Sequence, residues 1–521
     1  MTTAQALRAP INALPSEILT RIFLFIVESR PYTLYRDEYD HTPIIPKHPD
    51  LLLLVSSRWR DIAISSRSLW SHIDIVLSCP QSEAFLARAK VYVARAGHIP
   101  LDIHIVDPGT HPRYGLSGLA GFFNRDSDND DEDEDEEEDE EDSDIDLALT
   151  VFSENEIQQD NIRVDIGDFD CLGSALTPTA IRSLELFAYR DYHMSQLVAL
   201  QHYLSRCAAG TLTQLLIRAK IPKDGPLGHF IEYAYIGGSL DIQMEDLQKP
   251  MSTLTILHLK GLYPYWTSQA YCGLTDLFLG GRVRIPEQQL VEILKSNPRL
   301  QALRLDCRVT DPVVRENEQG ESEGEPPFDV HLENLEILDI HSLDYESATM
   351  LLRRLSYGSN PLRLCLSGID KYEDISHFLI RSKNLNVTEL RITSLRLHDL
   401  YDYLKRYPGL RTLVIGKWSE PDIPNNLSYR LCRLQFNLDW YNPGDKSQGV
   451  CLDTLYMMEL GILDNELRIM IEYYSVRRLV LWKSVVAVHG PGLVLLKKSE
   501  IAELCRVVEN LDMDEPNPVR Q

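Results

Sequence analysis

The residues that could carry catalysis in this chain stand apart from one another and match no catalytic spacing. The metalloprotease pattern His-Glu-x-x-His, the hydrolase pattern Gly-x-Ser-x-Gly and the phosphate-binding pattern Gly-x-x-x-x-Gly-Lys-Ser/Thr are all absent. Gly115, Ser117 and Gly118 fall one residue short of the hydrolase pattern, and no lysine accompanies the glycines after His489. We therefore predict no catalytic residue and no enzyme activity.

Potential metal ligands are equally dispersed along the sequence. The 9 cysteines include no Cys-x-x-Cys pair of the kind that binds zinc. His258 and His341 could lie on adjacent strands, but surface histidines are common on repeat proteins and do not by themselves indicate a ligand set. An acidic run could hold Ca²⁺ only without specificity. The sequence therefore predicts no metal and no cofactor.

The formal net charge is −26, and most of the excess comes from one stretch. Sixteen of the nineteen residues from Asp126 to Asp144 are Asp or Glu. Such a segment cannot bury enough apolar surface to offset its chain entropy, so we expect residues 108–150 to be a disordered acidic insertion. A patch for basic protein partners is the alternative. The sequence has no basic stripe, so we predict no nucleic-acid partner.

Targeting signals do not stand out in the sequence. No segment approaches the roughly 18 uninterrupted apolar residues of a membrane helix, and residues 1–17 lack the basic and apolar regions of a signal peptide. The odd, dispersed cysteines favour a reducing compartment. We expect a cytoplasmic or nuclear protein with no membrane partner.

Two stretches near the N-terminus predict a helical unit over residues 1–70. Apolar residues recur at helical spacing after Pro15, which suits a first helical turn. Residues 51–65 predict a second helix capped by Asp50, and residues 68–70 predict a third. The unit carries more large apolar side chains than one small core can bury, which indicates a partner surface. The alternative is a helical hairpin that only caps the rest of the chain.

These residues resemble an F-box. The similarity lies in Leu-Pro-x-Glu-Ile-Leu-x-x-Ile-Phe at 14–23, Val-Ser-x-x-Trp-Arg at 55–60 and the closing Leu-Trp at 69–70. In that family, three short helices dock onto a Skp-type adaptor and through it onto a cullin scaffold. Residues 29–49 lie where the family has a short connection, so we expect an inserted loop. The resemblance implies adaptor binding by Leu14, Pro15, Ile18, Leu19, Ile22, Phe23, Leu54, Val55, Trp59, Leu69 and Trp70.

A second pattern, Leu-x-x-Leu-x-Leu, recurs through residues 151–496 at intervals close to the leucine-rich-repeat period of about 20–29 residues. Helix-patterned segments at 287–298, 347–361, 397–409 and 465–475 separate several copies. One strand-loop-helix unit cannot cover its own apolar face, so neighbouring units must stack. The middle positions of the copies are Leu184, Leu215, Leu257, Leu277, Leu303, Leu338, Leu390, Leu413, Leu434, Leu455 and Leu479, with a weaker copy around Leu364.

These patterns predict an α/β fold: a three-helix F-box-like unit, then a leucine-rich-repeat solenoid with parallel strands on one face and helices on the other. Residues 71–107 read as strand, helix and strand, a linker or first irregular repeat that also resembles large fungal F-box families. We expect a loop at 315–327, a capping helix at 497–511 and a tail to residue 521. The repeat family's asparagine after the last strand leucine is missing, so we expect no asparagine ladder.

The non-leucine strand residues are the candidate binding residues. Strand side chains alternate, so the residue between the final two leucines of each copy faces away from the core. Aromatic and arginine side chains dominate binding energy at protein interfaces. The alternative is a solvated sheet face with incidental aromatics. We predict that an unknown protein substrate binds His258, Phe278, Arg304, Asp339, Arg391, Tyr456 and Trp482.

Together, the two resemblances imply a substrate-recognition adaptor of a Skp–cullin–F-box (SCF) ubiquitin ligase. Its F-box would bind the adaptor, and its repeats would bind the protein to be modified. The alternative is a non-catalytic leucine-rich-repeat scaffold, or an acidic binding protein, with no link to a ligase.

Overall fold

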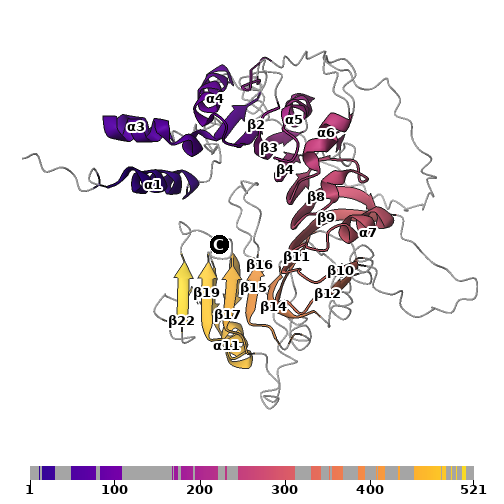
Figure 1. Ribbon diagram of the computed structural model, residues 1–521. Coiled ribbons are helices and arrows are strands. Elements are labelled where there is room, and N and C mark those ends of the chain that lie inside the picture. The colour runs from indigo at the N-terminus through magenta and orange to yellow at the C-terminus, as the bar shows by residue number, and fades with distance from the viewer. Residues whose placement is uncertain are drawn as a thin grey trace, which may run out of the picture.

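The computed structural model is an arc of strands (Figure 1). Helices α5 (Met194–Arg206), α6 (Met244–Met251) and α7 (Glu287–Lys295) lie on its outer side. The predicted acidic insertion at 108–150, the loop at 315–327 and all but the ends of the loop at 29–49 lie outside the described residues. The structure describes residues 11, 14–29, 49–77, 82–107, 167, 169–173, 178–191, 194–220, 229–231, 244–310, 330–341, 351, 355–367, 385–392, 407, 409–416, 432–433, 451–482, 484–488, 494–495, 500 and 507–511.

Fourteen of the described strands form one sheet, in which every hydrogen-bonded pair of neighbours is parallel. A long parallel sheet in a mixed α/β fold is consistent with the predicted leucine-rich-repeat solenoid. In sheet order the strands are β1 (His72–Val76), β2 (Leu101–Asp107), β3 (Ile181–Asp191), β4 (Gln214–Lys220), β6 (Ile256–Lys260), β8 (Asp276–Pro286), β9 (Ala302–Thr310), β11 (Ile337–His341), β13 (Leu362–Ser367), β14 (Val387–Ile392), β15 (Thr412–Gly416), β17 (Thr454–Met458), β19 (Arg478–Trp482) and β22 (Val507–Leu511).

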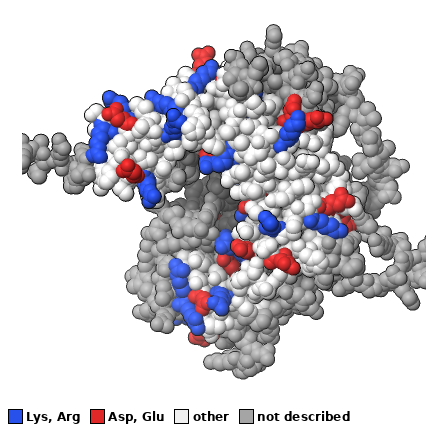
Figure 2. Space-filling view, viewed as in Figure 1, with Lys and Arg blue, Asp and Glu red and all other residues white. Residues whose placement is uncertain are grey.

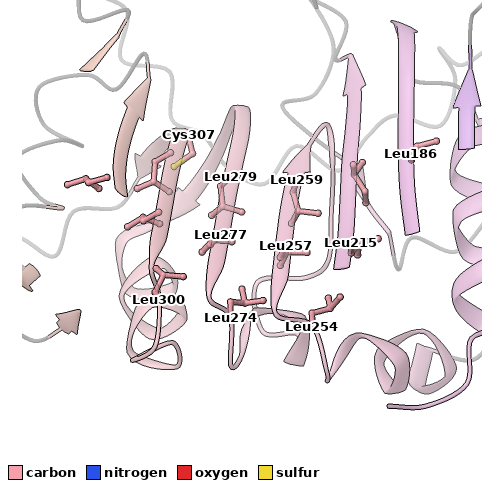
Figure 3. Packing of buried hydrophobic residues seen from close by; sticks show 14 of the residues in the cluster. Leu186, Leu215, Leu254, Leu257, Leu259, Leu274, Leu277, Leu279, Leu300 and Cys307 are labelled. Atoms are coloured by element: carbon pink, nitrogen blue, oxygen red, sulfur yellow. The ribbon is translucent and has the colours of Figure 1, made fainter. Parts of the chain in front are cut away.

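The template leucines of successive strands stack in rows (Figure 3). Leu215, Leu257 and Leu277 are cross-strand partners, and each is fully buried. This is the burial expected when each repeat covers the apolar face of its neighbour. The same row begins earlier than predicted, at Ile73 and Ile103 in β1 and β2, so residues 71–107 contribute the first two strands of the sheet.

The helices follow the strands along the arc (Figure 1). The predicted helices near 82–97, 287–298 and 465–475 are confirmed, and Gly97 ends the first of them with a φ of +64°. Leu290, Ile293 and Leu294 of α7 are buried in the same cluster as the strand leucines. No described helix has the length and apolar character needed to cross a bilayer. The bounds are α4 (Ser82–Ala96), α5 (Met194–Arg206), α6 (Met244–Met251), α7 (Glu287–Lys295) and α11 (Asp464–Tyr473).

Short strands beside the main sheet correct one predicted helix. Of the helix expected at 347–361, Leu355–Tyr357 instead forms a strand, because its backbone pairs in parallel with Val330–Leu332. The secondary elements are β5 (His229–Phe230) with β7 (Leu262–Tyr263), β10 (Val330–Leu332) with β12 (Leu355–Tyr357), the sheet of β16 (Cys432–Arg433), β18 (Leu460–Leu463), β20 (Val485–Val488) and β21 (Val494–Leu495), and the short 3-10 helix η5 (Gln269–Tyr271).

The C-terminal part of the array corrects two further predictions. The helix expected at 497–511 is wrong for Val507–Leu511, which pairs with β19 as the last strand. Asn510 occupies the register position of Leu481, so the leucine template does not reveal this strand. The copy centred on Leu434 lies outside the described residues except for Cys432–Arg433, which pair with β18 in a smaller sheet, and β15 pairs directly with β17.

Asparagines do connect successive turns, contrary to the prediction, but they precede the strands rather than follow them. Asn334, Asn360 and Asn386 each donate a side-chain hydrogen bond to a backbone carbonyl about one repeat earlier, at Pro298, Glu333 and Ser359. Asn297 is the buried member, and its Nδ2 donates to Tyr271 O at 2.6 Å. The asparagines that join successive repeats therefore stand before the strands, and not at the position after the strand that the repeat family uses.

A helical unit packs on the N-terminal end of the array (Figure 1). It comprises α1 (Ser16–Ser29), α2 (Leu52–Val55), α3 (Ser57–Ser65) and the 3-10 helix η2 (Arg67–Trp70). The expected single second helix is broken at Ser56, which is extended and caps α3 by accepting from Trp59 N. Asp50 does not cap α2, because its carboxylate instead accepts from Tyr92 Oη at 2.8 Å. The buried residues of this unit belong to the same hydrophobic cluster as the strand leucines of the array.

Candidate functional site

The residues predicted to bind an adaptor separate into two groups by exposure. Four are buried and hold the helical unit together: Leu19, Phe23, Leu69 and Trp70. Seven reach the surface wholly or in part: Leu14, Pro15, Ile18, Ile22, Leu54, Val55 and Trp59. The second group can contact a partner directly, whereas the first acts by fixing the positions of the helices.

The contacts between α1 and α3 set the shape of this surface. The rings of Phe23 and Trp59 lie 4.8 Å apart, and the Thr20 and Ser66 hydroxyls are hydrogen-bonded at 3.0 Å. The Arg58 guanidinium donates to the backbone carbonyl of Leu14 and so connects the start of α1 to α3. These contacts hold α1 against α3.

Exposed apolar side chains gather on this helical unit. Leu54 is 74% exposed, Phe25 70% and Val55 57%, although each has a large apolar side chain. Seven of the eight exposed large apolar residues in the described parts of the chain fall between residues 11 and 64. The sequence patterns assigned no binding role to Ile11, Phe25, Leu51 and Ile64. The seven residues are Ile11, Ile18, Phe25, Leu51, Leu54, Val55 and Ile64, and we call them the apolar surface.

A row of residues that lie between the template leucines runs along the opposite face of the sheet, as predicted from strand alternation. The register pairs His258 with Phe278, Phe278 with Arg304, and Arg304 with Asp339. We call it the inner row, and its described members are Asp74, His104, Glu185, Leu216, His258, Phe278, Arg304, Asp339, Cys365, Arg391, Val414, Tyr456, Val480 and Glu509.

Ion pairs fix the side chains in the middle of the inner row. Asp276 Oδ1 lies 3.0 Å from His258 Nε2 and 2.6 Å from Arg304 Nη1. Burial raises the pKa of Asp276, but the hydrogen bond from His258 and the charges of His258 and Arg304 outweigh it and hold that pKa below its usual range. Further along, Glu389 pairs with Arg391 at 2.6 Å and with Arg363 at 3.2 Å. These half-buried pairs leave polar groups in fixed positions on the sheet.

The C-terminal end of the inner row differs from the prediction. Trp482, expected to be an exposed binding residue, is only 7% exposed. It belongs to a small second cluster with Val414 and Met458, against which Tyr456 packs. Alternation assigns a side chain to a face of the sheet but does not say whether that face is covered. At Val414, Met458 and Trp482 the face is covered, and these side chains are buried. Tyr456 stays partly exposed, with the Arg478 guanidinium 5.9 Å from its ring centroid.

The N-terminal end of the inner row holds a polar group that sequence reasoning missed. Asp74 Oδ1 lies 3.2 Å from His72 Nε2 and 3.4 Å from His104 Nδ1, and Glu185 Oε2 lies 3.9 Å from His104 Nε2. Burial raises the pKa of Asp74, but hydrogen bonds from His104 and His72 hold it well below its usual range. Burial lowers the pKa of His104, but Asp74 and Glu185 raise it above its ordinary value. The similar segments His-Ile-Asp-Ile-Val at 72–76 and Asp-Ile-His-Ile-Val at 102–106 were the available signal.

Charges of both signs mix over the visible face of the arc. Figure 2 shows the described Lys and Arg side chains interspersed with Asp and Glu. The visible face therefore carries no field of a single sign.

Comparison with known proteins adds little to this geometry. No family model matches the sequence, and no curated protein matches it. Among solved structures, an internalin (inlF) from Listeria monocytogenes is similar over 61% of this chain and 83% of its own, with 14% identity and a TM-score of 0.24. The repeat architecture rests on the strand order and the leucine rows of this chain itself. Such an array is typical of proteins that bind other proteins.

Proposed function

We propose that this chain is the substrate-recognition adaptor of an SCF-type ubiquitin ligase in the cytoplasm or nucleus. The apolar surface binds a Skp-type adaptor and, through it, a cullin scaffold. The inner row binds the protein to be modified. The chain supplies proximity and orientation, while its partners perform the chemistry.

The concentration of exposed apolar residues on the helical unit is the observation that carries this proposal. Contiguous exposed apolar surface on a soluble protein marks a partner site more often than it marks chance. The same unit bears the Leu-Pro, Val-Ser-x-x-Trp-Arg and Leu-Trp motifs, and its first residues, Leu14 and Pro15, are not fully buried. Motif and exposure thus point to the same class of partner.

Substituting Leu54 and Val55 with aspartate is expected to reduce binding of a Skp-type adaptor at least tenfold, about 1.4 kcal/mol. The two side chains are 74% and 57% exposed, so the change places charge in the interface without disturbing the core. The measurement is co-purification and isothermal titration of the full chain with the adaptor. Val91→Asp is the matched control, because Val91 is 46% exposed but lies on α4, outside the apolar surface.

Failure of the unmodified chain to bind any Skp-type adaptor at micromolar concentration would remove the ligase function. The chain would then be a repeat scaffold whose helical unit caps the array. Equal losses from Val91→Asp and from the double aspartate variant would show general disruption rather than a docking surface.

The inner row is long enough for a protein interface. The eight strands from β6 to β17 that carry His258 through Tyr456 span about 34 Å at roughly 4.8 Å per strand, with Cys365 and Val414 buried within that span. A standard interface covers about 800 Å² on each partner. Ion pairs already orient Arg304 and Arg391, so less side-chain entropy is lost when a partner binds.

The double substitution of Arg391 and Tyr456 with alanine is expected to weaken capture of the substrate about tenfold, which equals about 1.4 kcal/mol. Proximity labelling with the full chain first identifies the substrate, and a binding titration then compares the variants. Arg477→Ala is the control, because Arg477 is 68% exposed and lies outside the inner row. Unchanged capture by the double variant would place the substrate site elsewhere, while adaptor binding should stay intact in every case.

A further inference from the structure

Three potential metal ligands meet at the N-terminal end of the inner row. They are His72 and Asp74 on β1 and His104 on β2, and one ligand atom from each lies within 4.8 Å of the other two. They form the one such group of three in the part of the chain that the structure describes. Asp74 and His104 are buried, whereas His72 is half-buried, so the group is reachable from solvent on one side.

The backbone fixes these three side chains on one face. His72 and Asp74 are two residues apart on one strand, so they point to the same side of the sheet. Asp74 and His104 are direct cross-strand partners in a parallel pair. The next partner in the same register is Glu185 on β3. The arrangement therefore depends on regular strand pairing and on no loop.

The two distances from Asp74 Oδ1 to the histidine nitrogens are close to those of a tetrahedral zinc site, and the two nitrogens lie within 4.8 Å of each other. Zinc bonds of about 2.0–2.2 Å to nitrogen and oxygen place neighbouring ligand atoms about 3.3–3.6 Å apart. The two contacts of Asp74 Oδ1 measure 3.2 Å to His72 Nε2 and 3.4 Å to His104 Nδ1. We propose that His72, Asp74 and His104 bind one Zn²⁺ ion, with the fourth position open to water.

The surroundings of His104 support this assignment. Its Nδ1 faces Asp74, and its Nε2 lies 3.9 Å from Glu185 Oε2 on the other side of the ring. Histidines that bind metals commonly have a carboxylate near the second ring nitrogen, because it fixes the ring orientation. Two imidazoles also favour zinc over Mg²⁺ or Ca²⁺, which prefer oxygen ligands.

Two other positions in the same sheet contain a histidine–aspartate pair without a second histidine. His341 pairs with Asp339 at 2.8 Å, and His258 pairs with Asp276 at 3.0 Å. Each contains one histidine and one carboxylate, and neither has a second histidine in a group of three among the described residues. These pairs supply controls that share the local chemistry but lack the third ligand.

The experiment measures Zn²⁺ binding to the full chain in excess Mg²⁺, which occupies sites made only of carboxylates, including the acidic stretch from Asp126 to Asp144. The probe is Zn²⁺ alone, followed by isothermal titration against a competing chelator. Wild type should bind one Zn²⁺ at this site. His72→Ala and His104→Gln should each weaken that binding at least tenfold, whereas His341→Ala should leave it unchanged.

Circular dichroism and thermal unfolding without zinc show whether each variant is folded. His72→Ala removes the least buried ligand, so it remains a usable variant if His104→Gln does not fold. Co²⁺ substitution adds a spectroscopic readout, because the visible absorption of bound Co²⁺ should disappear in His72→Ala. Zinc affinity that is equal in wild type and a folded His72→Ala variant would overturn the assignment. So would an equal loss of affinity in His341→Ala. Neither outcome bears on adaptor binding, which depends on the apolar surface.

Discussion

Replacing Trp70 with alanine is expected to lower the free energy of unfolding by about 3–5 kcal/mol. The side chain is fully buried, and its Nε1 donates to the carbonyl of Ala63 at 2.7 Å. The Tyr92 ring meets it edge-on with centroids 5.1 Å apart, and the Arg95 guanidinium lies 4.2 Å from the centroid of the Trp70 ring. Alanine would leave a cavity between η2 and α4 and would remove the indole hydrogen bond to the Ala63 carbonyl, which keeps the one from Ser66 N.

Chemical denaturation of the full chain measures this loss, with hydrogen exchange locating it at η2 and α4. Trp70→Phe should be milder, because it retains most of the packing and loses only the indole hydrogen bond. Phe25→Ala is the control, since Phe25 is 70% exposed and its removal should change stability by no more than about 0.5 kcal/mol. An unfolding midpoint for Trp70→Ala equal to that of wild type would show that Trp70 does not connect the helical unit to the array.

Asn297→Ala is expected to destabilise the array by about 2–4 kcal/mol, because it removes three hydrogen bonds to backbone groups, which contribute about 0.5–1.5 kcal/mol each. Its Oδ1 accepts from Leu274 N at 2.6 Å, and its Nδ2 donates to Tyr271 O and Ile293 O, each at 2.6 Å. The side chain is fully buried. It thus joins the end of α7 to the turn that begins β8.

Asn334→Ala is the matched comparison, because Asn334 occupies the next position of the ladder but is exposed and makes one hydrogen bond of 3.3 Å, to Pro298 O. Its loss should stay below about 1 kcal/mol. The check is a pair of denaturation curves under identical conditions. If the two variants lose the same stability, burial is not what makes Asn297 important.

The leucine rows could be predicted because burial at a fixed period is a local property of the sequence. Leu257, Leu277 and Leu303 occupy the register that their spacing implies. Strand β22 could not be predicted in this way, because Asn510 stands where the template requires an apolar residue. Backbone hydrogen bonds to β19 make Val507–Leu511 a strand, and the residue types of a single strand do not reveal its pairing partner.

In the candidate sites too, local patterns could be predicted from the sequence, whereas contacts between distant segments could not. Alternation correctly placed His258, Phe278 and Arg304 on one face, but it could not show that Trp482 is covered. The group around Asp74 depends on which residue of β2 lies opposite it, a question of register between strands. The resemblance and the excess of apolar residues predicted a partner surface that includes Ile18, Leu54 and Val55, whereas their exposure and that of Phe25 are known only from the structure.

The pairing of β2 with β3 has a consequence for how this chain can change over evolutionary time. The two strands are adjacent in the sheet although residues 108–180 separate them, whereas only residues 261–275 separate β6 from β8. Treated as flexible loops, the longer connection adds only about 1.4 kcal/mol of closure entropy, because that cost grows with the logarithm of length. Each junction between repeats is thus a place where the gene can gain or lose coding sequence while the neighbouring strands keep their register. New binding segments can be acquired there without redesigning the scaffold.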